Sequence, residues 1–196
     1  MRTFNRLAIY CGSATPPDPG YIALAREVGA QLARWGIGIV YGGGKVGLMG
    51  AVANAALDAG GEVIGIIPEA LVNAEVAHRG LTELHVVPDM HARKALFTSL
   101  ADGFVTLPGG TGTMDELWEA VSWAQLGYHD KPVGLLNVGG FYDQLIAFNR
   151  HMIEVGFIRA QHAGILIARD DLDALLDAMA AYEAHETIFS MKADRL

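Results

Sequence analysis

Residues 103–116 read GFVTLPGGTGTMDE: an apolar run, a turn with three glycines and the first residues of a helical pattern. Glycine lets the backbone turn sharply and approach a ligand with no Cβ in the way. The free N–H groups at the start of such a helix carry partial positive charge, which suits a phosphate. Glu116 adds a carboxylate beside this anion site, which indicates that the site is catalytic. The plainer interpretation is that Asp115 and Glu116 only complement the helix dipole from its first turn.

The same order of strand, turn and helix recurs along the chain. Short apolar runs predict strands at residues 7–11, 37–41, 63–67, 84–87, 104–107, 133–136 and 165–168. Helical patterns lie between most of them, at residues 21–35, 48–59, 90–100, 113–126, 141–155 and 172–184. Uninterrupted apolar strands indicate a sheet that is covered on both faces. We therefore expect an α/β fold, a single Rossmann-like, doubly wound domain over residues 1–196, with a mostly parallel sheet of about seven strands.

Two segments are less regular than the rest. Residues 68–87 follow the third strand, and we expect them to form a rim loop or a flexible flap. The polar residues 186–196 are predicted to be a loosely attached tail.

A second glycine turn, residues 42–50 (GGGKVGLMG), follows a buried strand. Lys45 is not followed by Ser or Thr, so the turn does not match the nucleotide loop that holds magnesium. A dinucleotide pattern can be fitted here, but no acidic residue ends a strand about 20 residues further on. These departures argue against a classical NAD site.

Ligands of open parallel sheets bind beyond the carboxyl ends of the strands, near the switch in strand order. Ser13 follows the first predicted strand, Gly43 and Gly44 follow the second, and residues 108–113 follow the fifth. Ser13 either donates to a ligand or caps its turn, and the sequence favours neither. Together the three turns predict a pocket of mononucleotide size at one edge of the sheet.

Composition narrows the class of protein. The chain has 14 Lys and Arg against 22 Asp and Glu, a net charge of −8, which argues against a nucleic-acid binder. A small anionic substrate can still bind through local positive groups. No apolar run reaches the ~20 residues of a membrane helix, and no signal peptide is recognisable. Cys11 is the only cysteine. It excludes an internal disulfide and favours a cytoplasmic location, with Cys11 itself as a small apolar residue.

Arg93 and Lys94 lie at the start of a predicted helix, where the helix dipole disfavours cations. Either they grip a phosphate or polarise a substrate, or they form a solvated pair on a surface helix, and the spacing supports both equally. His78, His85 and His91 lack the tight spacing of metal ligands, so no metal is expected.

The pattern Met90-x-x-Arg93-Lys94, followed by Pro108-Gly109-Gly110-x-Gly112-Thr113-x-x-Glu116, resembles the signature of the Lonely Guy family. The similarity extends over roughly residues 7–168. Proteins of this family were once labelled lysine decarboxylases. They cleave cytokinin nucleoside 5′-monophosphates to the free base and ribose 5-phosphate.

The resemblance implies a catalytic pair, Arg93 and Glu116, and no cofactor. It also implies substrate contacts at Glu75, Lys94, Gly109, Gly110, Thr111, Gly112, Thr113, Met114, Asp115 and Ser122, to which the glycine turns add Ser13, Gly43 and Gly44. The expected substrate is a nucleoside monophosphate, of the isopentenyladenine type or AMP. The expected assembly is a homodimer.

Two other functions are compatible with the same fold. One is a non-catalytic carrier of a nucleotide or of the molybdenum cofactor. The other is the decarboxylase of the older label, which would normally need pyridoxal phosphate held by a lysine in a suitable setting.

Overall fold

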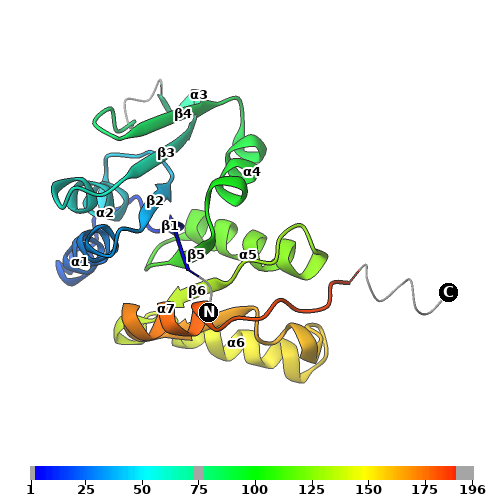
Figure 1. The fold of residues 1–196 in the computed structure, drawn as a ribbon. Helices are drawn as coiled ribbons and strands as arrows, with labels where there is room; N and C mark the ends of the chain where they lie inside the picture. The colour runs from blue at the N-terminus through cyan, green and yellow to red at the C-terminus, as the bar shows by residue number, and fades with distance from the viewer. Residues whose placement is uncertain (1–2, 73–76, 189–196) are drawn as a thin grey trace.

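The fold is a single parallel sheet with helices on both faces, described in a computed structural model over residues 3–72 and 77–188 (Figure 1). The sheet order is β4-β3-β2-β1-β5-β6-β7, and every neighbouring pair is parallel. The strands are β1 (Arg6–Tyr10), β2 (Gly38–Tyr41), β3 (Val63–Pro68), β4 (Glu83–Val87), β5 (Gly103–Thr106), β6 (Val133–Leu136) and β7 (Leu166–Arg169). The predicted doubly wound α/β fold is confirmed.

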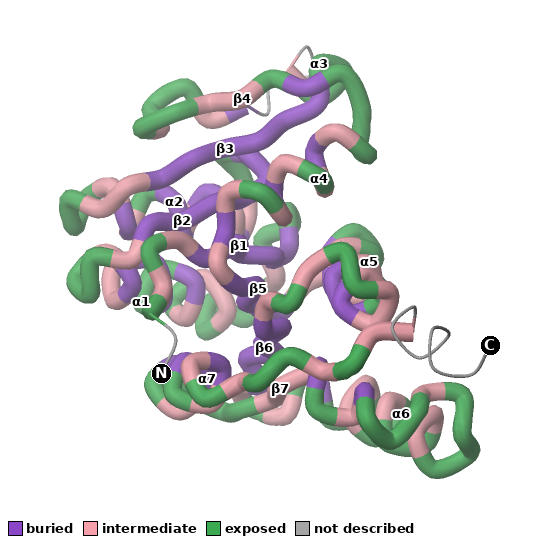
Figure 2. Tube along the Cα trace, turned by 45° about the vertical axis from the view of Figure 1, so that its right-hand side comes forward, coloured by how far each residue is buried: buried purple, intermediate pink, exposed green. Residues whose placement is uncertain are grey.

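The helices divide between the two faces of the sheet. They are α1 (Gly20–Arg34), α2 (Gly47–Asp58), α3 (Glu69–Val72), α4 (Met90–Leu100), α5 (Thr111–Leu126), α6 (Asp143–Glu154) and α7 (Leu172–Ala180). Residues of α1, α2 and α7 share one core cluster, whereas residues of α4, α5 and the start of α6 share the other. The central strands between them are buried along their length (Figure 2).

Strand β1 shows why both faces are covered. Leu7 and Ile9 point into the core beneath α1, α2 and α7, and Ala8 and Tyr10 point into the core beneath α4 and α5. Successive side chains of a strand face opposite ways, so a strand that is apolar at every position must be covered twice. This confirms the interpretation of the uninterrupted apolar runs.

The structure corrects the expectation of a rim loop. Besides the predicted strand β4, residues 68–87 contain the end of β3, the short helix α3 and a bridge between Gly44 and Ala77. Of the predicted loose tail, residues 189–196 lie outside the described residues. At its start, Ile188 N–H donates to Gln125 O (3.1 Å) and the carbonyl of Glu186 is bonded to His162 Nε2 (3.1 Å). The loose tail stays a prediction.

Strand order reverses at β1, which lies between β2 and β5. The carboxyl ends of these three strands lead into the turns before α2 and α5, which is where ligands bind in open α/β sheets. In residues 3–72 and 77–188, no helix has the length and apolar character that crossing a bilayer requires.

Candidate active site

The turns that follow β1 and β5 are in contact. Gly12 N–H donates to Pro108 O (3.1 Å), and Gly12 O accepts from Leu48 N–H (3.1 Å) at the start of α2. A Cβ on Gly12 would lie 3.3 Å from the Cα of Gly109, so the close approach favours glycine at both positions. The turns after β1 and β5 and the start of α2 therefore lie against one another at one edge of the sheet.

Helix α5 begins at Thr111, two residues earlier than expected. Its N-cap, Gly110, is extended and provides no side-chain cap, so the first N–H groups of the helix are not capped by that residue. A Cβ on Gly109 would lie 2.1 Å from Thr113 Oγ1, which is why the turn needs glycine there. Because the helix starts earlier, Asp115 and Glu116 lie beyond its first turn. The interpretation of these acids as first-turn complements of the dipole is wrong.

Glu116 forms a buried ion pair with Arg93. Arg93 Nη2 donates to Glu116 Oε1 at 2.9 Å, and the two side chains are only 9% and 11% exposed. Burial raises the pKa of Glu116 from 4.5 to about 7; the charge of Arg93 opposes this rise, and Asp115 and Glu119 add to it. A carboxyl group that titrates near neutral pH beside an anion site can accept or release a proton during a reaction.

Helix α4 and the turn after β2 place Arg93. The N-cap Asp89 accepts a hydrogen bond from Ala92 N–H (2.8 Å), and the guanidinium lies 5.4 Å from the centre of the Phe97 ring. A Cβ on Gly42 would lie 2.3 Å from Arg93 Nη2, so the guanidinium occupies the space that this glycine leaves. Arg93 is therefore a buried residue of the site and not part of a solvated surface pair.

One donor of Arg93 has no partner. Its Nε is buried and makes no hydrogen bond within residues 3–72 and 77–188. A buried donor without an acceptor is costly and is found at functional sites more readily than in ordinary cores.

Lys94 lies beside the buried pair and contacts two acids. Its Nζ is 2.8 Å from Asp115 Oδ2 and 3.0 Å from Glu119 Oε2. Burial lowers the pKa of Lys94, but its hydrogen bonds to the two carboxylates outweigh this and raise the pKa overall. Lys94 therefore remains a cation. Sequence reasoning missed Glu119, although its spacing of three from Glu116 and four from Asp115 places all three acids near one another on α5.

The other predicted site residues are less closely connected. Ser13 is exposed after β1, and Gly43 and Gly44 are buried after β2. Gly43 has φ 71°, and Tyr41 O–H donates to Gly44 O (3.1 Å). These bonds give the second turn a structural role in addition to any contact with a ligand.

One predicted contact lies away from the ion pair. Ser122 is exposed on α5, six residues beyond Glu116, which is about 9 Å along a helix axis. Glu75 lies outside the described residues. Both stay predictions.

Metal and thiol chemistry find no support in the described residues. In residues 3–72 and 77–188 no group of three or more His, Cys, Asp and Glu side chains could hold a metal ion. Cys11 is buried in the core, and burial raises the pKa of its thiol far above the usual value, as expected for a small apolar residue.

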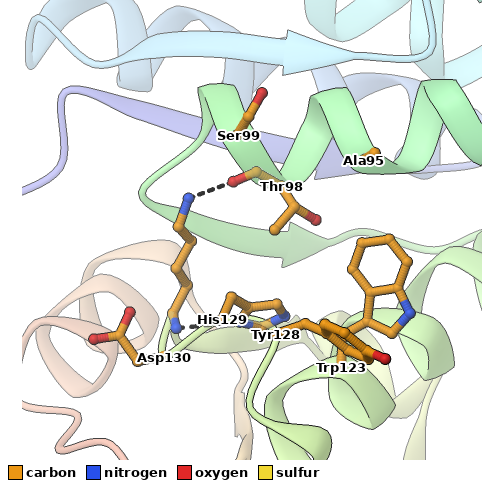
Figure 3. Close-up of a pocket in the computed structure, with 8 residues that line it drawn as sticks. Ala95, Thr98, Ser99, Trp123, Tyr128, His129 and Asp130 are labelled. Atoms are coloured by element: carbon orange, nitrogen blue, oxygen red, sulfur yellow. Dashed lines mark hydrogen bonds between the residues drawn. The ribbon is translucent and has the colours of Figure 1, made fainter.

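A separate cavity of about 680 Å³ lies along α4 and the end of α5, lined by Ala95, Thr98, Trp123 and Tyr128 among others (Figure 3). The cation that lines it is already bonded: Lys131 Nζ donates to the carbonyls of Thr98 and Ala101 at the end of α4. This cavity has an aromatic wall and contains neither glycine turn. It does not match the expected nucleotide site.

Comparison with known proteins shows the family of the chain. The family model described as possible lysine decarboxylase matches residues 49–179. The cytokinin riboside 5′-monophosphate phosphoribohydrolase LOG of Oryza sativa subsp. japonica is 47% identical, over 84% of this chain and 68% of that protein. The cytokinin riboside 5′-monophosphate phosphoribohydrolase of Rhodococcoides fascians is 44% identical over 90% of each chain.

Solved structures share the fold at lower identity. The molybdenum cofactor carrier protein of Chlamydomonas reinhardtii has a TM-score of 0.66 and 20% identity, over 90% of this chain and 96% of that chain. The molybdenum cofactor binding protein of Rippkaea orientalis has the same TM-score and identity, over 90% and 95%. These likenesses concern the fold alone.

Proposed function

The chain belongs to the Lonely Guy family, whose family model is described as possible lysine decarboxylase, and from this premise we propose that it is a nucleotide hydrolase. Its reaction is hydrolysis of the N-glycosidic bond of cytokinin riboside 5′-monophosphates, of AMP, or of both, with release of the free base and ribose 5-phosphate. One observation carries the proposal. Glu116, on the helix that begins at the glycine turn, forms a buried ion pair of 2.9 Å with Arg93 of α4.

The chemistry follows from Glu116. The bond between C1′ of the ribose and a nitrogen of the base breaks, and its electron pair leaves with the base. Positive charge develops on the ribose, and a nearby carboxylate stabilises it. Water adds to C1′ and gives a proton to Glu116, the departing base takes up a proton from solvent, and Glu116 then releases its proton to solvent. A pKa of about 7 suits this role, because Glu116 is then partly ionised at neutral pH and able to accept a proton.

Arg93 acts electrostatically in this proposal. A guanidinium is a poor proton donor, because it does not lose its charge at ordinary pH. It holds the Glu116 carboxylate in place through Nη2, and its positive charge acts on the reacting groups from beside that carboxylate.

The 5′-phosphate has its natural partner at the start of α5. The N-cap Gly110 has no side chain that could accept a hydrogen bond from the first backbone N–H groups of this 16-residue helix. Helix ends of this kind favour anions. Arg93 and Lys94 face Asp115, Glu116 and Glu119, so their side chains add no positive charge to compete for the phosphate.

The lysine decarboxylase description fits Lys94 and Lys131 poorly. Such an enzyme would normally use pyridoxal phosphate on a lysine. Lys94 is held by two carboxylates that keep it protonated, and Lys131 Nζ is bonded to two carbonyls at the end of α4. Neither presents a free amine for a Schiff base.

A non-catalytic carrier is the second candidate, favoured by the fold shared with the molybdenum cofactor carriers. A carrier has no need of a buried carboxyl group with a pKa near neutrality beside its anion site. That feature is why we favour catalysis.

Two further parts of the proposal rest on the resemblance and on composition. A homodimer follows from the resemblance and is tested by sedimentation. A reducing, cytoplasmic location follows from the single buried cysteine and is tested by fractionation of the source cells.

The experiment that tests the function is release of free base. Purified protein at micromolar concentration is incubated with AMP and with isopentenyladenosine 5′-monophosphate, and base and ribose 5-phosphate are quantified. The hydrolase releases both products in equal amounts from at least one nucleotide. Binding of nucleotide in calorimetry without any release of base would instead identify a carrier.

A further inference from the structure

A second ionic contact lies directly beside the catalytic pair. Lys94 follows Arg93 on α4, and its Nζ lies between Asp115 and Glu119 of α5 at 2.8 and 3.0 Å. Residues four apart on a helix lie on the same face, so one lysine can contact both acids. The contact joins the same two helices as the pair of Arg93 and Glu116.

The two acids are not equivalent. The side chain of Asp115 is 60% exposed, whereas those of Glu119 and Lys94 are 23% and 14% exposed. An exposed ion pair is weakened by water and salt, and a partly buried pair is screened less. The Lys94–Glu119 contact is therefore the stronger constraint on Lys94.

Helices α4 and α5 depend on side chains for their relative position. The backbone of α4 packs mainly against β1 to β4, and that of α5 packs against β1, β5 and β6. Between the two helices, Phe97 and Leu117 share a core cluster, and the ionic contacts span the edge that carries Arg93 and Glu116. A change in the ionic contacts should therefore shift Arg93 relative to Glu116 without unfolding the sheet.

We propose, on the premise of the hydrolase function above, that Glu119 is a positioning residue: through Lys94 it holds α4 against α5 and so keeps Arg93 and Glu116 in contact. Glu119 need not touch the substrate for this role. It acts through its bond to Lys94.

The charge of Glu119 also acts on Glu116. The groups that face Glu116 are Arg93 and Lys94 from α4, Asp115 and Glu119 from α5, and the buried Tyr10 and Cys11 at the end of β1. Burial raises the pKa of Glu116 most; Asp115 and Glu119 raise it further, while Arg93 and Lys94 lower it. Loss of the Glu119 charge alone therefore lowers the pKa of Glu116, whereas separation of Arg93 from Glu116 raises it, and Arg93 has the larger effect.

The test compares Glu119→Gln with the wild type in two ways. The pH dependence of base release is measured, and the Glu116 carboxyl is titrated by NMR in protein labelled at glutamate. We expect turnover to fall severalfold, and both the acid limb and the NMR titration to move to higher pH, because the lost contact with Arg93 outweighs the lost charge of Glu119. Glu27→Gln, the same change on an exposed part of α1, should alter none of these.

A double-mutant cycle tests whether Glu119 acts through Lys94. Glu119→Gln should have little further effect on turnover in a Lys94→Ala background. Glu119→Asp keeps the charge but shortens the reach to Lys94, so it should also lower turnover and move the titration of Glu116 to higher pH.

Three outcomes would overturn the proposal. The NMR titration of Glu116 could stay unchanged or move to lower pH, Glu119→Gln could reduce turnover as much in the Lys94→Ala background as in the wild type, or a lower melting temperature could be the only change. The NMR measurement does not depend on the reaction. If wild-type protein releases no base, the proposed function fails, and the titration still decides whether Glu119 tunes Glu116.

Discussion

Replacement of Gly42 by alanine should impair catalysis through Arg93 alone. The new Cβ would lie 2.3 Å from Arg93 Nη2, the atom that donates to Glu116, and 3.1 Å from Met49 Sδ. Ordinary contact begins at 3.4 Å, so the guanidinium must withdraw by about 1.1 Å. A misplacement of about 1 Å can cost roughly 10²-fold in rate. We expect a loss of that order in the release of base.

The assay pairs turnover with thermal unfolding, because overpacking alone costs about 1–3 kcal/mol of stability. Gly134→Ala is the matched control: its Cβ would meet Met179 Sδ at 2.5 Å, a similar overlap beneath α7. It should lower the melting temperature to a similar extent and leave turnover nearly unchanged. The reasoning is refuted if Gly42→Ala turns over normally, or if Gly134→Ala loses as much turnover.

Two further predictions concern pH and the phosphate. Turnover should fall as the pH is lowered, with a midpoint near pH 7. The reaction requires the ionised Glu116, and burial raises the pKa of this carboxyl to about 7. A pH–rate profile with a midpoint near 4.5 would contradict this prediction. Adenosine should be a much poorer substrate than AMP, because the N–H groups at the start of α5 then lose their anion. Equal kcat/KM values for the two, measured in one assay, would remove the phosphate site from the account.

Much of the fold was predictable because its signals are local. The uninterrupted apolar runs predict all seven strands, and no predicted strand end differs from the observed one by more than one residue. The sequence predicts the start of α5 two residues too late, because Thr111 and Gly112 are poor helix formers. The extended backbone of Gly110, which marks the residue before the helix, is visible only in the structure. Helix α6 begins at Asp143 and not at Phe141, because left-handed Gly139 and Gly140 extend the preceding turn.

The site was predictable as a set of residues and not as an arrangement. The family motifs predict that Arg93 and Glu116 act together, but their contact depends on how α4 and α5 pack on the sheet. The space that Gly42 leaves for Arg93 arises between β2 and α4, segments about 50 residues apart in the chain that only the fold brings together. Lys94 was expected to contact the substrate, and its bonds to Asp115 and Glu119 give it a structural partner as well.

Glu116→Gln, measured for turnover and for melting temperature at pH 8 on the same preparation, tests the central claim most directly. Glutamine matches the protonated side chain in size but cannot stabilise a cationic ribose or accept a proton from water. Burial raises the pKa of Glu116, so this carboxyl stabilises the fold below its ordinary pKa, and that contribution is lost as pH rises through about 7. The account predicts a loss of turnover of roughly 10²-fold or more, with a melting temperature at pH 8 no lower than that of the wild type. Near-normal turnover with a lowered melting temperature would contradict it.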